Sequence, residues 1–262
     1  MTVTLVLPES ISKQIDHISQ QPLETAGVLL VAVVNDSEGG LRLLAREYHP
    51  VKDDAYLRRQ EDCLSIASSG YVSALARAEQ LNATAMWVHT HPGDGSSPMP
   101  SSHDDVVDTQ LAETFRLRSG TDFYGALIFS PLGSGLQFTG HIAVDRGPKL
   151  QIDRMWEVGD QFRLTYSARS EKPVAPSMFD RNIRAFGEAV QATLSDLKIG
   201  IVGCGGTGSA VAEQLVRLGV RRFILIDPDT LSQSNLTRVY GSEAQDVGHR
   251  KVDVIADHLK KI

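Results

Sequence analysis

The stretch that decides the fold of the first half of the chain is Trp87-Val88-His89-Thr90-His91-Pro92. Residues 84–91 contain an apolar run at 85–88 and end at a loop rich in glycine and proline, which predicts a buried strand. Because side chains alternate along a strand, His89 and His91 point from the same face, about 7 Å apart along the backbone. Two imidazoles on one rigid face supply two of the three protein ligands of an open zinc site.

The segment after this loop can supply a third ligand. A helix is predicted over residues 102–117, because apolar residues recur there at every fourth position. Asp104 lies in the first turn on the inward face, whereas Asp105 points away from it. Both acids also fit a helix cap, since a serine at 101 or 102 with an acid three residues later is a capping pattern. We assign the cap as the explanation of Asp105 and the ligand role to Asp104.

This pattern resembles the JAMM (MPN+) zinc metalloprotease family, whose signature is a distant Glu, then His-x-His-Pro, then Ser-x-x-Asp. The matching residues are Glu24, His89, His91, Pro92, Ser101 and Asp104. The sequence departs from the family in one respect, because twelve residues separate His91 from Asp104 instead of the usual ten. The loop 93–99 can absorb two residues, since loop entropy grows slowly with length. Asp105 and His103 stay open as alternative ligands.

The resemblance implies a zinc-dependent peptidase or isopeptidase of the deubiquitinase-like kind. His89, His91 and Asp104 would hold zinc, with a water at the open position. Glu24 would act as the general base, and Ser101 would donate a hydrogen bond to the oxyanion. Glu24 precedes a glycine and an aliphatic strand, as in the family, which favours this role over a solvated acid. The implied substrate is the bond after the C-terminal glycine of a ubiquitin-like protein.

Composition excludes several other classes of protein. The chain has 262 residues, a net charge of −6 and a pI near 5.7, which gives no electrostatic basis for binding nucleic acid or an anionic membrane. No apolar run is long enough to span a bilayer, and the N-terminus does not resemble a signal peptide. The two cysteines, Cys63 and Cys204, lie in unrelated contexts and indicate no disulfide framework. A cytoplasmic location is expected.

The order of predicted elements indicates an α/β protein with two modules. Residues 1–168 are predicted to form a JAMM-type curved sheet flanked by helices, with a polar connection over 49–60 and a helix over 63–81. Residues 169–177 are polar and contain two prolines, which is typical of a linker. Residues 178–262 are predicted to form a partial Rossmann-like β-α-β module.

The second module is predicted from Lys198-Ile199-Gly200-Ile201-Val202-Gly203-Cys204-Gly205-Gly206-Thr207-Gly208-Ser209. This stretch is typical of a strand, a glycine-rich turn and a helix start, where the backbone and the helix N-terminus favour a phosphate. Residues 223–227 follow as a parallel strand. On spacing alone, the pattern fits a dinucleotide site equally well, because glycine spacing by itself is weak evidence.

Neighbouring residues favour a different nucleotide. Asp227-Pro228-Asp229, residues 234–238 and Lys251 resemble the adenylation domain of ubiquitin-activating and ThiF-like enzymes, and residues 179–184 resemble that family's arginine-bearing helix. This resemblance implies ATP with Mg²⁺ as the cofactor. The implied roles are phosphate contacts for Gly203, Gly205, Gly206 and Gly208, ribose binding for Asp227, triphosphate binding for Asn235, Arg238 and Lys251, and reach into a partner subunit for Arg181.

Residues 178–262 supply only two parallel strands, without the family's metal-binding Asp or thioester-forming Cys. The chain is therefore expected to be a piece of a longer protein or to complete this module against another surface.

Both resemblances imply the same partner, the C-terminal tail of a ubiquitin-like protein in a bacterial-type modification system. A conjugating enzyme and a second copy of a completed second module are further expected partners. Three hypotheses stay open: a zinc isopeptidase tied to an activating module, an ATP-dependent adenylating enzyme with an accessory first module, and a non-catalytic scaffold that binds a ubiquitin-like tail.

Overall fold

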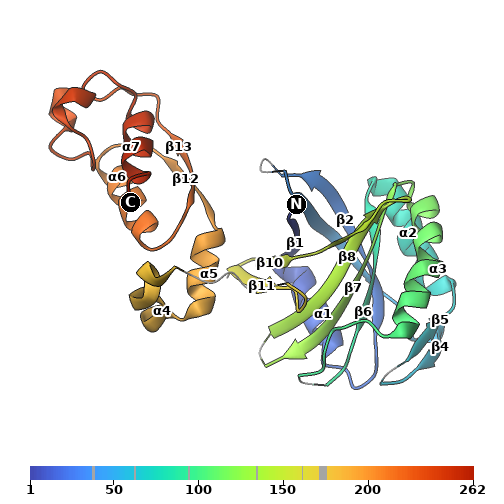
Figure 1. The fold of residues 1–262 in the computed structure, drawn as a ribbon. Coiled ribbons are helices and arrows are strands. Elements are labelled where there is room, and N and C mark those ends of the chain that lie inside the picture. The colour runs from blue at the N-terminus through green and yellow to red at the C-terminus, as the bar shows by residue number, and fades with distance from the viewer. Residues whose placement is uncertain (37–38, 62, 94, 134, 161, 171–175) are drawn as a thin grey trace. The chain divides into compact units, whose positions relative to one another are not determined.

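The computed structural model describes residues 1–36, 39–61, 63–93, 95–133, 135–160, 162–170 and 176–262. The chain divides into two compact units, Met1–Lys172 and Pro173–Ile262 (Figure 1). Each unit has its own buried apolar cluster. The α/β class predicted from the sequence is confirmed, with a large curled mixed sheet in the first unit.

The first unit is built on one nine-stranded sheet with the order β11-β10-β1-β3-β2-β6-β7-β8-β9. Its strands are β1 (Val3–Pro8), β2 (Ala26–Asn35), β3 (Leu41–Pro50), β6 (Thr84–Thr90), β7 (Phe123–Leu132), β8 (Gly135–Val144), β9 (Lys149–Gln151), β10 (Arg154–Val158) and β11 (Phe162–Tyr166). The sheet is mixed, because β6 pairs in parallel with β7 and antiparallel with β2. The Ala168 N–H donates to the Phe138 carbonyl at 2.9 Å, so the chain after β11 returns to β8.

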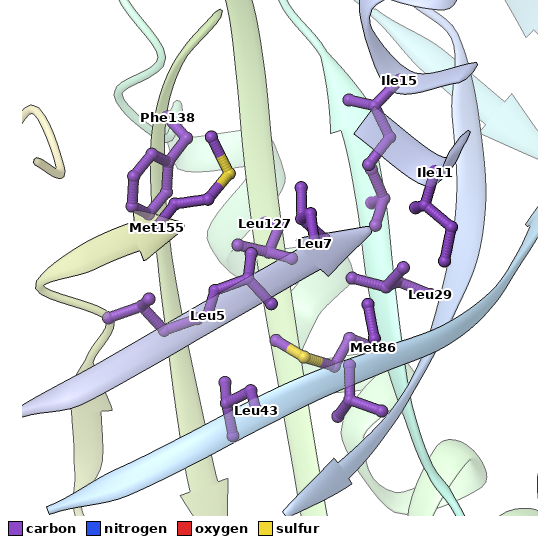
Figure 2. Packing of buried hydrophobic residues seen from close by; sticks show 14 of the residues in the cluster. Leu5, Leu7, Ile11, Ile15, Leu29, Leu43, Met86, Leu127, Phe138 and Met155 are labelled. Atoms are coloured by element: carbon purple, nitrogen blue, oxygen red, sulfur yellow. The ribbon is translucent and has the colours of Figure 1, made fainter. Parts of the chain in front are cut away.

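Helices cover both faces of this sheet. On one face α1 (Glu9–Ser19) buries Ile11 and Ile15 among residues of β1, β3 and β7. Glu9 follows Pro8, whose fixed backbone suits the residue before a helix. Figure 2 shows this core, in which Ile11 and Ile15 of α1 share one cluster with side chains from seven strands: Leu5, Leu7, Leu29, Leu43, Met86, Leu127, Phe138 and Met155.

The other face is covered by α2 (Ser69–Leu81) and α3 (Ser102–Ser119), which pack together (Figure 1). Phe115 of α3 is fully buried at the centre of this layer. Its ring lies 5.5 Å from that of Tyr71, 6.3 Å from Trp87 and 5.6 Å from Tyr124, between centroids. The helix ends at Gly120 with φ of 69°, a left-handed conformation that glycine adopts without strain.

One prediction in this unit is wrong. Residues 63–81 do not form a single helix, because Leu64–Ile66 is strand β5 and pairs with β4 (Tyr56–Arg59). The polar connection 49–60 therefore contains a strand, preceded by a short 3₁₀ turn at Asp53–Ala55. Pairing between these two short segments overrides the local helical spacing that led to the prediction.

The second unit places a β-α-β motif beside further helices. Strands β12 (Lys198–Val202) and β13 (Arg222–Ile226) are parallel, with Ile199 opposite Phe223. Its helical segments are η2 (Ser177–Phe179), α4 (Asp180–Phe186), α5 (Glu188–Asp196), α6 (Gly206–Arg217), η3 (Gln233–Asn235), η4 (Ala244–Asp246) and α7 (Lys251–Leu259). Most of the predicted linker, residues 171–175, lies outside the described residues. No helix among the described residues is both long and apolar enough to cross a bilayer.

Phe115→Ala should destabilise the first unit by about 3–5 kcal/mol, because it removes a buried ring and leaves a cavity. Urea unfolding of the first unit, followed by tryptophan fluorescence, measures this change. Leu117→Ala is the matched control on the same helix, where the side chain is 78% exposed and a change within about 0.5 kcal/mol is expected. Equal effects of the two substitutions would contradict the packing described here.

Candidate functional site

His89 and His91 lie at the end of β6, in the middle of the sheet. His89 is paired with Ala26 of β2 on one side and Ile128 of β7 on the other, so its backbone is fixed on both sides. The residue is only 4% exposed. Neither ring nitrogen has an aligned hydrogen-bond partner among the described residues. Buried polar atoms are normally satisfied, so this imidazole is available to a ligand.

The start of α3 brings Asp104 to the histidines. Ser101 caps the helix, because its hydroxyl accepts from the Asp104 N–H at 3.2 Å while Asp104 Oδ2 accepts from the Ser101 N–H at 2.7 Å. The Ser101 hydroxyl also donates to Asp104 Oδ2 at 2.8 Å. The capping acid is therefore Asp104, and the assignment of the cap to Asp105 is wrong, because the helix begins one residue earlier, after Ser101. The cap holds the Asp104 carboxylate toward the sheet.

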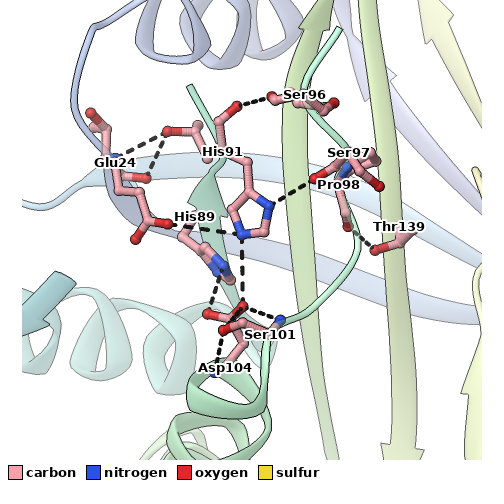
Figure 3. Close-up of polar contacts among 12 residues, drawn as sticks. Glu24, His89, His91, Ser96, Ser97, Pro98, Ser101, Asp104 and Thr139 are labelled. Atoms are coloured by element: carbon pink, nitrogen blue, oxygen red, sulfur yellow. Dashed lines mark hydrogen bonds and ion pairs between the residues drawn. The ribbon is translucent and has the colours of Figure 1, made fainter. Parts of the chain in front are cut away.

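These three residues form one cluster, shown in Figure 3. His89 Nε2 lies 3.1 Å from Asp104 Oδ1, and His91 Nε2 lies 3.7 Å from Asp104 Oδ2. One donor atom from each residue can be chosen so that all lie within 4.8 Å of one another. Among the described residues this is the group of histidine, cysteine and acidic side chains that could share a metal ion, and it contains neither Asp105 nor His103.

The electrostatics of the cluster favour an ionised carboxylate. Burial by itself would raise the pKa of Asp104, but the two imidazoles and the Ser101 N–H hold it well below its usual range. Burial would likewise lower the pKa of His91, but Asp104, the Ser97 carbonyl and Glu24 outweigh it and raise that pKa. A charged carboxylate facing two imidazoles is a donor set that suits a divalent cation.

Glu24 lies at the edge of the cluster and is 5% exposed. Its Oε1 is 3.9 Å from His91 Nε2 (Figure 3). Its backbone is held by the β4–β5 segment, because the Glu24 N–H donates to the Gln60 carbonyl at 2.9 Å and Arg59 Nε donates to the Glu24 carbonyl at 3.0 Å. The hairpin that the sequence analysis missed thus positions this acid.

The loop between His91 and α3 contributes partners that the sequence analysis also missed. His91 Nδ1 bonds the Ser97 carbonyl at 2.9 Å, which orients the ring and leaves Nε2 facing Asp104. The loop is fixed by three side chains of β7 and β8: Ser130 and Gln137 donate to the Ser96 carbonyl at 2.9 and 2.6 Å, and Thr139 donates to the Pro98 carbonyl at 2.6 Å. The sequence signal for these contacts is the alternation of polar residues such as Gln137 and Thr139 with apolar residues along β8.

The second unit forms a glycine-rich turn between β12 and α6. Gly203 has φ of 90°, a conformation that favours glycine. A Cβ on Gly208 would lie 1.8 Å from the Gly203 carbonyl oxygen, so only glycine allows α6 to start here. Gly205 has open space around its Cα. The turn therefore presents bare backbone at a helix N-terminus, the arrangement that binds phosphate groups.

Asp227 ties this turn to the end of β13. Its two carboxylate oxygens accept from the Cys204 N–H at 2.6 Å and the Asp229 N–H at 2.8 Å. Burial would raise the pKa of Asp227, but these N–H groups and Lys251 lower it. The acid stays ionised beside the glycine-rich turn.

Three further predicted residues lie around the same turn. Arg238 packs its stem at 3.3 Å from the position of a Cβ on Gly206 and donates from Nη1 to the Ser234 carbonyl at 3.1 Å. Lys251 Nζ bonds Asp229 Oδ2 at 2.7 Å. Asn235 is 9% exposed and accepts from the Ser232 N–H at 3.2 Å, so its side chain supports the local turn.

Arg181 lies away from this group. It is exposed on α4, in a segment that packs against the C-terminal end of α6. Gln191 Nε2 donates to the Leu218 carbonyl at 3.1 Å, and a Cβ on Gly219 would contact the Phe179 ring at 3.4 Å. The glycine-rich turn is at the opposite, N-terminal end of this 12-residue helix, so the structure does not bring Arg181 to the turn.

Comparison with known proteins finds a family match within the second unit. Residues 179–262 match the ThiF family. The tRNA threonylcarbamoyladenosine dehydratase of Bacillus subtilis is 36% identical over 84 residues, which are 32% of this chain and 33% of that protein. The ubiquitin-like modifier-activating enzyme 5 of Oryza sativa is 35% identical over 121 residues, 42% of this chain and 28% of the relative.

A third relative is the ATP-dependent ubiquitin transferase-like protein Cap2 of Enterobacter hormaechei. It is 38% identical over 80 residues, which are 30% of this chain and 13% of the relative. The chain therefore spans a third or less of the length of each of these relatives. The ThiF-like resemblance is confirmed for the second unit, and it supports ATP with Mg²⁺ as the cofactor there.

The predicted enzyme class, a zinc metalloprotease of the deubiquitinase-like isopeptidase kind, is wrong. The relatives found are threonylcarbamoyladenosine dehydratases and activating enzymes, which are not metalloproteases. The prediction inferred a hydrolytic reaction from the spacing of possible metal ligands in the sequence. Such spacing indicates what the side chains can bind, and the reaction depends on further features of the site.

Gly208→Ala should destabilise the second unit by about 1–3 kcal/mol or more, because the added methyl group overlaps the Gly203 carbonyl. Amide hydrogen exchange of residues 198–226 measures the loss of protection. Gly200→Ala is the matched control, because nothing lies within 4 Å of its Cβ position and its φ is not positive. Normal protection in Gly208→Ala would show that the turn can open without cost.

Proposed function

Because residues 179–262 form a ThiF-family domain, we propose that this chain is the nucleotide-binding part of an ATP-dependent adenylating enzyme. Residues 1–168 would then be an accessory module. The observation that carries this proposal is the glycine-rich turn at the start of α6, to which Asp227 is bonded through the Cys204 N–H. The turn offers phosphate contacts, and Asp227 offers an acceptor for a ribose hydroxyl.

The cations around the turn support a triphosphate as the ligand. Arg238 stands against Gly206, and Lys251 lies at the start of α7 beside Asp229. In this proposal Gly203, Gly205, Gly206 and Gly208 contact the phosphates through the backbone. Arg238 and Lys251 bind the phosphate oxygens, with Asn235 orienting the segment between them. A dinucleotide with a single pyrophosphate would leave part of this positive charge unused.

The reaction class is transfer of an adenylyl group to a carboxylate. A carboxylate oxygen of the substrate attacks the α-phosphorus, the bond to the β-phosphate oxygen breaks, and pyrophosphate leaves. We propose that the substrate is the C-terminal carboxylate of a ubiquitin-like protein, because one relative activates ubiquitin-like modifiers. Arg181, at the far end of α6, would act on a second copy of the domain.

The accessory module, in our proposal, binds zinc through His89, His91 and Asp104. Tetrahedral zinc with bonds of about 2.0–2.2 Å places its ligand atoms roughly 3.3 Å apart. The observed separations of 3.1 and 3.7 Å between the imidazole nitrogens and the Asp104 oxygens fit this requirement. The JAMM-like arrangement of these ligands would serve to bind the metal ion or to stabilise the module. Glu24 would add negative charge beside His91.

Arg238→Ala should weaken binding of ATP with Mg²⁺ by about 10- to 100-fold, the loss expected for one charge-assisted hydrogen bond of about 1.5–3 kcal/mol. Isothermal titration calorimetry of the full chain measures it. The matched control is Lys261→Ala, an exposed cation of the same unit, which should leave the affinity unchanged. Binding of NAD⁺ in place of ATP, or equal ATP affinity in both variants, would refute the nucleotide assignment.

His89→Ala and Asp104→Ala should each lose bound zinc, whereas the wild-type protein should retain about one zinc per chain. Elemental analysis after reconstitution and dialysis measures the metal content. Asp105→Ala and His103→Ala are matched controls next to Asp104 that should keep the metal. Zinc retained in Asp104→Ala but lost in Asp105→Ala would identify Asp105 as the third ligand. Absence of zinc from the wild-type protein would refute the proposed zinc site.

A further inference from the structure

A buried acid of the second unit joins its two long helices. Glu213 of α6 is 6% exposed. Its Oε2 accepts from His258 Nε2 of α7 at 2.5 Å, and its Oε1 accepts from Arg217 Nε at 2.7 Å. Burial would raise the pKa of Glu213, but Arg217 and His258 outweigh burial and lower it. Both carboxylate oxygens are therefore bonded, and the His258 ring is held in one orientation.

The His258 ring supports a turn formed by residues 238–242. A Cβ on Gly241 would lie 2.0 Å from His258 Cγ and 2.4 Å from its Cδ2 and Nδ1, so the backbone of this turn lies directly against the ring. Gly241 also has φ of 73°, a left-handed conformation that favours glycine. Glycine at 241 thus allows the turn to rest on His258.

The turn 238–242 is attached to α6 at a second point. The Tyr240 N–H donates to Ser209 Oγ at 3.0 Å, and Ser209 Oγ donates to the Gly206 carbonyl at 3.1 Å. Ser209 is 1% exposed, so its hydroxyl spends both its donor and an acceptor site within the protein. Two adjacent residues of the turn, Tyr240 and Gly241, are therefore held from α6 and α7.

This turn carries Arg238. The backbone carbonyl and the side-chain stem of Arg238 lie 3.3 Å from the position of a Cβ on Gly206, at the start of the glycine-rich turn. The side chain is exposed, whereas the next residue, Val239, is 4% exposed and belongs to the core of the unit. A long cation on a fixed backbone loses less conformational entropy when it binds an anion than one on a mobile backbone.

We propose that Glu213 and His258 are positioning residues for nucleotide binding. They hold the turn 238–242 against α6, and the turn places Arg238 beside the glycine-rich turn. Glu213 lies seven residues after Gly206, about 10 Å along the helix axis, so the pair acts on a bound phosphate through the turn. This inference rests on the proposed binding of ATP.

The first test is calorimetric titration of the full chain with ATP and Mg²⁺. His258→Ala should raise the Kd about 3- to 10-fold, the cost of ordering one released arginine and its turn. His258→Gln should stay within about twofold of the wild type, because its amide N–H can donate to Glu213. The control is Asp257→Ala, an exposed neighbour of His258, which should leave the affinity unchanged.

A double-mutant cycle tests whether the effect passes through Arg238. In a chain that already carries Arg238→Ala, adding His258→Ala should not weaken ATP binding further, because the residue that His258 positions is missing. A general loss of structure would instead weaken binding equally in both backgrounds. Equal losses would therefore overturn the proposal.

Amide hydrogen exchange without nucleotide tests the turn itself. The Tyr240 amide should exchange at least about threefold faster in His258→Ala than in the wild type, and at the wild-type rate in His258→Gln. Unchanged exchange or wild-type ATP affinity in His258→Ala would overturn the proposal, as would a His258→Gln variant as weak as His258→Ala. Failure of the wild type to bind ATP would refute the proposed function, and the exchange rates would still decide whether the pair holds the turn.

Discussion

The first unit depends on the complete burial of β6 between β2 and β7. Every residue of Thr84–Thr90 is buried, and the strand is hydrogen-bonded on both sides. A one-residue slip would turn His89 and His91 to the opposite face, so the hydrophobic pattern that fixes the register also fixes the imidazoles. The candidate metal cluster and the position of α3 both follow from this register.

The Ser101–Asp104 pair shows how one local motif can have two consequences. In the sequence, the serine and acid could be explained either as a helix cap or as part of a ligand set. In the structure the same Asp104 carboxylate accepts from the cap N–H and faces both histidines. The two explanations are therefore compatible, because a carboxylate has two oxygens and several lone pairs. The cap already restricts the conformational freedom of the Asp104 side chain, so less conformational entropy is lost when the carboxylate binds a metal ion.

The units differ in how well sequence anticipated them. The glycine-rich turn was predicted closely, because Gly203 and Gly208 are required by local backbone geometry that spacing reveals. The β4–β5 hairpin was missed, since Tyr56–Arg59 and Leu64–Ile66 are short and take their conformation from pairing with each other. Metal-ligand spacing in the first unit led to the prediction of a zinc metalloprotease. This enzyme class is wrong, because the relatives found are adenylating and dehydratase enzymes.

The sequence by itself determined the α/β class, the strand carrying His89 and His91, and the phosphate-type turn, because periodicity and glycine requirements are local. Only the tertiary structure decided which acid joins the histidines, since Asp104 and Asp105 are neighbours that differ by one step around a helix. It also decided that Glu213 and His258, from two different helices, meet at Gly241 in the turn that carries Arg238. Contacts between segments far apart in the chain depend on sheet order and helix packing, and these leave no periodic signal in the sequence.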